Sequence, residues 1–240
     1  MDNTLKFSQP QVNKRNELLM GIKKALPVVI GYLPIAISFG VIAAQTGLPL
    51  LHTVLMSFMV YAGASQFMAA NMLGMEILGL EIIFATFILN FRHFIMSMSL
   101  MSRLQHLSIV KKIYLSFGIT DETFALISME ENDNSKEMTF YFIAGAMLSA
   151  YFSWGFGTLL GGLLSMVIPP SIGNSMSIGL YAMFIGLLMP SVKDNHRIGI
   201  IAIISGGLCY LFNLYLNPGW AIVIATLVGG FIGSFILQGE

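Results

Sequence analysis

Three polar residues, Asn90, Arg92 and His93, stand in the middle of an otherwise apolar run, FILNFRHFIMSMSL, at 87–100. On a helix with 100° per residue, Asn90 and His93 share one stripe and Arg92 lies on another. An arginine at the centre of a membrane span costs about 2.5–3.5 kcal/mol on insertion scales, so it generally faces a partner or a watery cavity. The pattern therefore predicts that this segment lies inside a helical bundle and that Arg92 needs a carboxylate partner.

Carboxylates follow in the next apolar segment, 113–129, which holds Asp121 and Glu122 near its middle. If this helix breaks at Gly118, Thr120 or the aspartate becomes an N-cap, and the exposed amides form an anion site at mid-membrane. If the helix is continuous, the same acids still make a polar centre. Two simpler interpretations remain open: an ion pair that only holds two helices in register, and an interfacial segment with its acids in water.

Two further groups are candidates for the same site. His93 has an unperturbed pKa near neutrality, which suits a proton relay beside the acids, although a satisfied interior histidine fits as well. The run VYAGASQFMAAN at 60–71 combines small residues with polar ones, among them Ser65 and Gln66. Small residues permit close backbone approach and most often form helix-packing faces, so both packing and ligand-lining roles are open.

The composition decides the class of protein that positions these residues. Of 240 residues, 56% are hydrophobic and only 10% are charged, which is too few charges to solvate a globular surface. The apolar stretches are about twenty residues long and apolar all round, as membrane helices are. We predict an all-α integral membrane protein, a bundle of about six to eight membrane segments. The segments lie at 25–45, 51–73, 77–101, 113–129, 138–167, 175–191, 198–215 and 218–237.

The charged loops predict the topology. Cytoplasmic loops are enriched in Lys and Arg, which places the basic N-terminal segment 1–24 and the loops 103–112 and 193–197 in the cytoplasm. The acidic loop 130–137 then lies outside by default. If all eight segments crossed, this assignment would fail twice. One segment before 103–112, and one between 130–137 and 193–197, should therefore not cross.

A weak internal sequence repeat indicates which segments these are. SFG at 38–40 and YA at 61–62 return as GFG at 155–157 and YA at 181–182. The repeat favours two inverted halves, 25–129 and 138–237, inside one transmembrane domain, 25–238. In each half the second segment, 51–73 or 175–191, would be re-entrant or broken, as recurs in secondary transporters. The alternative is that most segments cross and the charge rule fails locally.

Four motifs carry a resemblance to a known family. They are LPIAISFG at 33–40, YAGASQF at 61–67, NFRHFIMSMSL at 90–100 and TDETFAL at 120–126. In this order and at these spacings they resemble the AzlC family, the large subunit of branched-chain amino acid permeases. The resemblance implies export of leucine, isoleucine and valine from bacteria across the cytoplasmic (inner) membrane, with methionine also handled by some members. It also implies a small, separately encoded membrane partner of the AzlD type.

The residues fit such a substrate. A zwitterion with an apolar side chain needs an anion site, an acceptor for its ammonium and an apolar pocket. Arg92 or helix-end amides can take the carboxylate. Asp121 or Glu122 can take the ammonium, or carry a coupling proton if burial favours the protonated form. Aromatic residues, Phe39, Tyr61 and Phe67, can border the side chain. The candidate substrate-binding or coupling residues are Ser38, Phe39, Tyr61, Ser65, Gln66, Asn90, Arg92, His93, Thr120, Asp121 and Glu122.

The sequence also weighs against other classes. It contains no GxxxxGK[ST] motif for an ATPase, so we expect the export that the resemblance implies to be secondary active transport, coupled to protons. An intramembrane enzyme would need a nucleophile–base pair or a metal set, whereas the spans offer scattered serines and one histidine. We therefore expect neither enzymatic activity nor a cofactor or metal. The main alternative is a channel or a non-catalytic subunit of a membrane complex.

Overall fold

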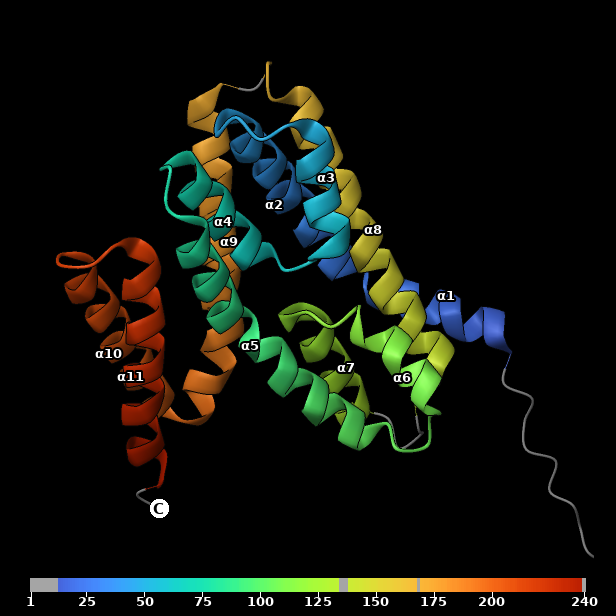
Figure 1. Ribbon diagram of the computed structural model, residues 1–240. Helices are drawn as coiled ribbons and strands as arrows, with labels where there is room; N and C mark the ends of the chain where they lie inside the picture. Colours follow the sequence, from blue (N-terminus) through green and yellow to red (C-terminus); the bar gives the residue numbers. More distant parts are fainter. Residues whose placement is uncertain (1–12, 134–137, 168, 239–240) are drawn as a thin grey trace, which may run out of the picture.

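The computed structural model describes residues 13–133, 138–167 and 169–238, and every regular element in these ranges is a helix (Figure 1). The predicted all-α class is thereby confirmed. Five helices in the described ranges are long and apolar enough to cross a membrane. They are α2 (Leu26–Gln45), α5 (Gly79–Arg103), α8 (Phe140–Leu164), α10 (His196–Asn213) and α11 (Pro218–Gln238).

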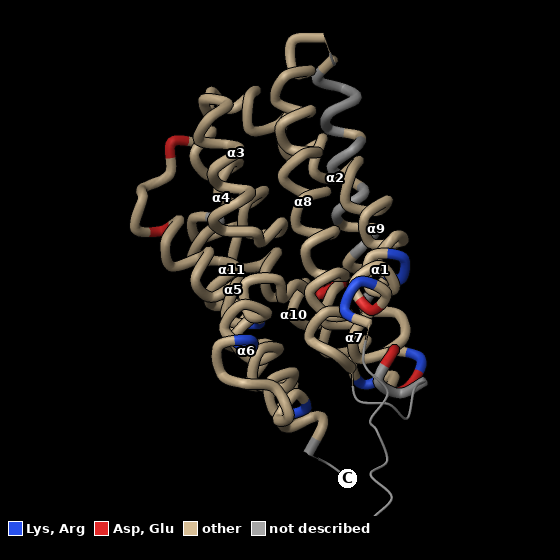
Figure 2. The backbone as a smooth tube through the Cα atoms, turned by 90° about the vertical axis from the view of Figure 1, so that its right-hand side faces the viewer, with Lys and Arg blue, Asp and Glu red and all other residues tan. Residues whose placement is uncertain are grey.

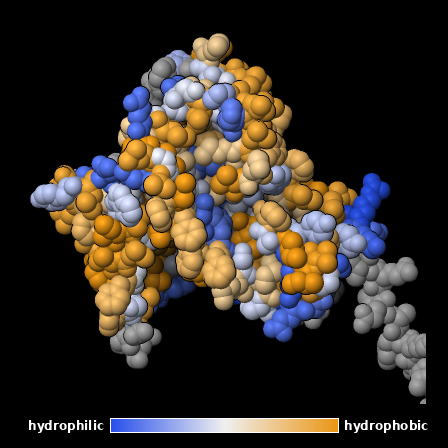
Figure 3. All heavy atoms as spheres, in the orientation of Figure 1, coloured by the Kyte–Doolittle hydropathy of each residue, from blue (hydrophilic) through white to orange (hydrophobic). Residues whose placement is uncertain are grey.

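Charge and polarity are distributed as a membrane protein requires. Among the described residues, Lys and Arg lie in the lower half of the view in Figure 2, whereas acidic residues occur in both halves. Figure 3 shows apolar side chains over most of one face, with hydrophilic side chains in a hollow near its centre. A single basic end is what the positive-inside rule predicts.

The N-terminal helix α1 (Lys14–Lys24) packs on the bundle. Its Gly21 lies against the backbone of Phe142, and Leu18 lies against Gly145 of α8. Residues 1–12 of the predicted N-terminal segment lie outside the described residues. The described part of that segment is therefore a helix attached to the membrane domain.

The central pair of the bundle is α2 and α8, which touch along most of their lengths. Tyr32 meets Trp154 edge-on with ring centroids 5.2 Å apart, and further along both helices Gly161 lies against the backbone of Ile37. Because glycine has no Cβ, the two backbones approach closely. The contacts advance together along the two helices, so α2 and α8 run in the same direction. The inverted relation expected between the two halves is not observed for these first elements.

The first hairpin is re-entrant, as predicted for 51–73. It consists of α3 (Leu50–Met59) and α4 (Gly63–Gly74), which run in opposite directions (Figure 1). A Cβ on Gly74 would lie 2.7 Å from Cγ2 of Thr46, so the hairpin ends beside the point where it begins. This segment therefore enters and leaves the bundle at one end.

The second hairpin is also re-entrant and enters from the opposite end. It consists of α6 (Ile109–Ser116) and α7 (Asp121–Asp133) (Figure 1). His106, before the hairpin, has Nε2 only 3.0 Å from the carbonyl oxygen of Met138, after it. The segment 113–129 therefore does not cross the bundle.

The position of this hairpin corrects the predicted topology. At its end Glu130 forms an ion pair with Lys24, so the flanks of the acidic loop 130–137 lie at the same end as the basic residues and not at the opposite end, as predicted. Residues 134–137 themselves lie outside the described residues. The prediction failed because acidic residues contribute little to orientation, so their sign does not place a loop.

The prediction for the segment 175–191 is also wrong. This segment forms part of one continuous helix, α9 (Pro170–Asp194), and has no break. At the tip of the first hairpin, the side-chain oxygen of Gln66 accepts a hydrogen bond from the backbone amide of Ala62. Gly186 stands at the same number of residues after the second YA motif, and it has no side chain to form such a bond. The chain then closes with the antiparallel pair α10 and α11.

Candidate substrate-binding site

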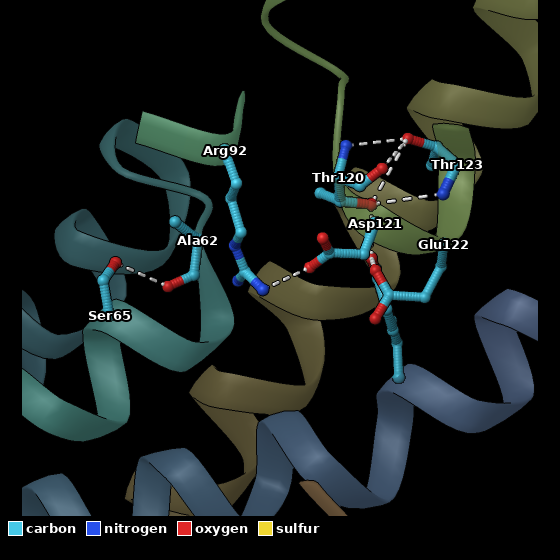
Figure 4. A network of polar contacts seen from close by, with 8 residues as sticks. Ala62, Ser65, Arg92, Thr120, Asp121, Glu122 and Thr123 are labelled. Atoms are coloured by element: carbon cyan, nitrogen blue, oxygen red, sulfur yellow. Dashed lines mark hydrogen bonds and ion pairs between the residues drawn. The ribbon is translucent and has the colours of Figure 1, made fainter. Parts of the chain in front are cut away.

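The tips of the two re-entrant hairpins meet in the interior, where α5 passes between them (Figure 4). They enclose a polar pocket of about 20 Å³, which is room for about one water molecule. The site is therefore closed in this conformation. Its lining residues are Tyr32, Tyr61, Ala62, Gly63, Ala64, Arg92, His93, Thr120, Asp121, Glu122, Trp154 and Phe184.

The centre of the pocket is an ion pair. Nη1 of Arg92 lies 2.9 Å from Oδ2 of Asp121, and the side chains are 29% and 22% exposed (Figure 4). The guanidinium also lies 5.2 Å from the ring centroid of Phe184. Its Nε is buried and has no hydrogen-bond partner among the described residues. Arg92 thus has the carboxylate partner that the sequence predicted, and its Nε–H remains available to donate a hydrogen bond.

The α7 end of the site is a helix N-terminus, formed by a break at Gly118, which is one of the two geometries that the sequence left open. Oγ1 of Thr120 accepts from the amide of Thr123 at 3.3 Å, and the amide of Thr120 donates to Oγ1 of Thr123 at 2.9 Å. This reciprocal bonding caps α7, with Thr120 as the N-cap. Asp121 begins the helix, where a negative charge interacts favourably with the dipole.

A second helix N-terminus faces the same pocket from the opposite side. Ala62 is the N-cap of α4, and its carbonyl accepts from Oγ of Ser65 at 2.9 Å. A Cβ on Gly63 would lie 2.7 Å from the indole of Trp154, so glycine lets this terminus pack closely. Tyr61, just before it, has a left-handed backbone with φ of 47°. Two positive helix ends therefore converge beside Arg92, which favours an anion.

Tyr32 is a member of the site that sequence reasoning missed. Its hydroxyl donates to Oε2 of Glu122 and lies 2.7 Å from Oγ1 of Thr120. Its hydroxyl in the middle of an apolar span was the available signal, because a buried tyrosine O–H usually finds a partner. Trp154 and Phe184 carried no comparable signal.

Five of the predicted site residues lie outside the pocket lining. Gln66 is fully buried; its Nε2 donates to Oγ of Ser57 at 2.9 Å, and its Oε1 accepts from Nε1 of Trp154 at 3.1 Å. It positions the hairpin tip on α8. Phe39 packs edge-on against Phe67, with centroids 5.4 Å apart. The five residues outside are Ser38, Phe39, Ser65, Gln66 and Asn90, whereas Tyr61, Arg92, His93, Thr120, Asp121 and Glu122 line the pocket.

A much larger cavity, of about 800 Å³, adjoins the pocket. Tyr61, Ala62 and His93 line both spaces, so they separate the two, and Asn90 lines the larger one. The cavity extends below the tip of the first hairpin towards the start of α8 and reaches Leu18 of α1. Its walls are mostly apolar, and it runs from the polar site towards the basic end.

Comparisons with known proteins agree with this picture of a membrane protein. Residues 27–168 match the family model described as AzlC protein. An uncharacterized membrane protein of Archaeoglobus fulgidus is 31% identical over 222 residues, which cover 90% of this chain and 93% of that one. The inner membrane protein YgaZ of Escherichia coli is 32% identical over 222 residues, covering 90% and 89%.

A third relative has a named activity. The branched-chain amino acid transport protein AzlC of Bacillus subtilis is 28% identical over 173 residues, which cover 69% of this chain and 67% of that one. No solved structure matches the chain. Since the family model covers more than half of the sequence and relatives above 30% identity span nearly all of it, the chain belongs to the AzlC family of membrane proteins.

Proposed function

We propose that this protein is a proton-coupled secondary transporter that exports branched-chain amino acids across the bacterial cytoplasmic membrane. The observation that carries the proposal is the Arg92–Asp121 ion pair, held between two helix N-termini beside a large apolar cavity. The relative from Bacillus subtilis, named for branched-chain amino acid transport, supports the substrate class.

The ion pair matches the two charges of an amino acid. The substrate carboxylate binds Arg92 and the amides at the start of α4, and its ammonium binds Asp121. The closed pocket has no room for both the pair and a substrate, so binding separates the two side chains. A zwitterion replaces the lost contact with two new ones. A ligand with a single charge leaves one protein charge unpaired in a partly buried place, which is costly.

The apolar cavity suits the substrate side chain. Its inner end lies beside Tyr61 and His93, so a bound amino acid can place its aliphatic part there. With the N-terminus in the cytoplasm, as the basic residues favour, the cavity opens towards the cytoplasm. A site loaded from the cytoplasm is what an exporter needs. The AzlD-type partner is part of the proposal on family resemblance alone.

Export is tested in cells that lack this protein. The cells are loaded with leucine-containing dipeptides, and leucine efflux is compared with and without the protein, with the small partner co-expressed. We expect faster efflux that continues against a leucine gradient and stops on adding a protonophore. Flux that follows the gradient and ignores the protonophore would identify a channel instead. Equal efflux in both strains would remove the proposal.

A further inference from the structure

Two adjacent acids share the pocket, but their neighbours differ. Asp121 is paired with the guanidinium of Arg92 at 2.9 Å. Glu122 accepts a hydrogen bond from the hydroxyl of Tyr32, and no described Lys or Arg forms an ion pair with it. The protein therefore neutralises the charge of Asp121 and leaves that of Glu122 without a cation.

A carboxylate deep in a membrane protein with no cation is stabilised by taking up a proton. We propose that Glu122 carries the coupling proton, while Asp121 stays ionised to bind the substrate ammonium. This inference rests on the proposed function, which requires a carrier for the coupling proton and an acceptor for the substrate ammonium. It assigns the first role to Glu122 and the second to Asp121. It predicts that the acids can be separated experimentally, although they are neighbours in the chain.

The surroundings of Glu122 contain several titratable groups, contributed by four elements. Tyrosine hydroxyls come from α2 and from the first hairpin tip, and a guanidinium and an imidazole come from α5. The walls contributed by α8 and α9 are aromatic and do not titrate near neutrality. The titratable groups that line the pocket with Glu122 are Tyr32, Tyr61, Arg92, His93 and Asp121.

Electrostatics makes proton and substrate compete. A hydronium ion on the outer side transfers its proton to a carboxylate oxygen of Glu122 and leaves a water molecule. On the cytoplasmic side the O–H bond of the glutamic acid breaks and a water molecule accepts the proton. A substrate ammonium beside Asp121 favours the ionised form of the adjacent glutamate and so expels its proton. By reciprocity, a protonated Glu122 weakens substrate binding by the same factor. Alternate occupancy of this kind exchanges one proton for one amino acid.

Tyr32 links the proton to the second hairpin. Its hydroxyl touches both Glu122 and Oγ1 of Thr120, the N-cap of α7, at 2.7 Å from the latter. When Glu122 is ionised, Tyr32 donates to it. When Glu122 is protonated, its O–H can donate to Tyr32, which then donates to Thr120. Tyr32 is thus a positioning residue whose hydrogen bond depends on the proton.

The test uses the full-length protein with its small partner in liposomes. Leucine counterflow without a pH gradient measures transport alone, and leucine accumulation driven by a pH gradient measures coupling. We expect Glu122→Gln to lose accumulation, since a glutamine cannot titrate. It should keep counterflow at saturating leucine but with a higher KM for leucine, because glutamine resembles the protonated glutamate. Asp121→Asn should lose both activities. Glu130→Gln, on the same helix but paired with Lys24, is the matched control and should retain both.

The outcomes separate this inference from the proposed function. Wild-type protein without counterflow would overturn the proposed function itself. Normal counterflow with gradient-driven accumulation by Glu122→Gln would overturn the inference alone. If that variant does not fold, Tyr32→Phe decides: loss of the donor to the carboxylate should move the midpoint of the pH profile of counterflow upward, and an unchanged profile would contradict the assignment.

Discussion

The ion pair between Arg92 and Asp121 permits a test that separates binding from architecture. Each side chain is neutralised alone, as Arg92→Gln and Asp121→Asn, and then both together. Each single change leaves one charge without its partner in a partly buried site. Removing one member of a buried pair costs about 3–5 kcal/mol, and exposures of 29% and 22% favour the lower value.

The magnitude follows from that estimate. A loss of about 3 kcal/mol corresponds to a change of roughly 150-fold in an equilibrium constant. For a chain of this size, thermal unfolding moves by about 2–4 °C per kcal/mol, so each single variant should unfold about 6–12 °C lower. The double variant leaves no charge unpaired, and its stability should return to within about 1 kcal/mol of wild type.

The assay combines thermal unfolding in detergent with leucine counterflow. We expect both single variants and the double variant to lose counterflow, although the double variant regains stability. A double variant that regains both would show that the pair only holds helices in register, and the reasoning about the substrate would be refuted. Normal counterflow by both single variants would remove the site altogether.

Three further predictions concern the surroundings of the site. Tyr61→Gly should relieve about 1 kcal/mol of left-handed backbone strain at φ 47°. Because it also joins the pocket to the apolar cavity, phenylalanine should then compete with leucine in counterflow. An unchanged competition profile would contradict the role of Tyr61 as the wall between the two spaces. Gln66→Leu should lower stability by about 2–3 kcal/mol, measured by thermal unfolding, because it leaves buried partners unsatisfied. Gly161→Ala should cost about 1–3 kcal/mol or more by forcing a Cβ against the backbone of Ile37, whereas Gly186→Ala, with open space around it, should be neutral or slightly stabilising; equal effects would contradict the close packing.

Local chemistry made part of the site predictable. The arginine in an apolar span required a carboxylate, and Gly118 with Thr120 made a helix break one of two open alternatives, because glycine and a capping hydroxyl are both favourable there. The break and the Arg92–Asp121 pair are both present. The re-entrant segment 51–73 was also predictable. The basic segments on either side required an even number of crossings, and the internal sequence repeat indicated which segment does not cross.

Other features depend on long-range contacts that a single sequence does not display. The predicted position of the acidic loop 130–137 was wrong because acidic residues have only a weak influence on the side of the membrane on which a loop lies. The continuous helix α9 differs from the first hairpin by the lack of a residue like Gln66, whose partners Ser57 and Trp154 come from two other helices. Tyr32 belongs to the site because α2 lies beside the second hairpin, a contact between segments far apart in the sequence.

The central claim is that a zwitterion binds between Arg92 and Asp121, and ligand-dependent stability measures this most directly. A ligand at one hundred times its Kd stabilises the folded protein by about 2.7 kcal/mol. We predict that leucine raises the unfolding temperature of the purified protein, whereas 4-methylpentanoate, which lacks the ammonium, and 3-methylbutylamine, which lacks the carboxylate, do not. Equal protection by either single-charge analogue, or protection of the Arg92→Gln/Asp121→Asn double variant by leucine, would contradict the account.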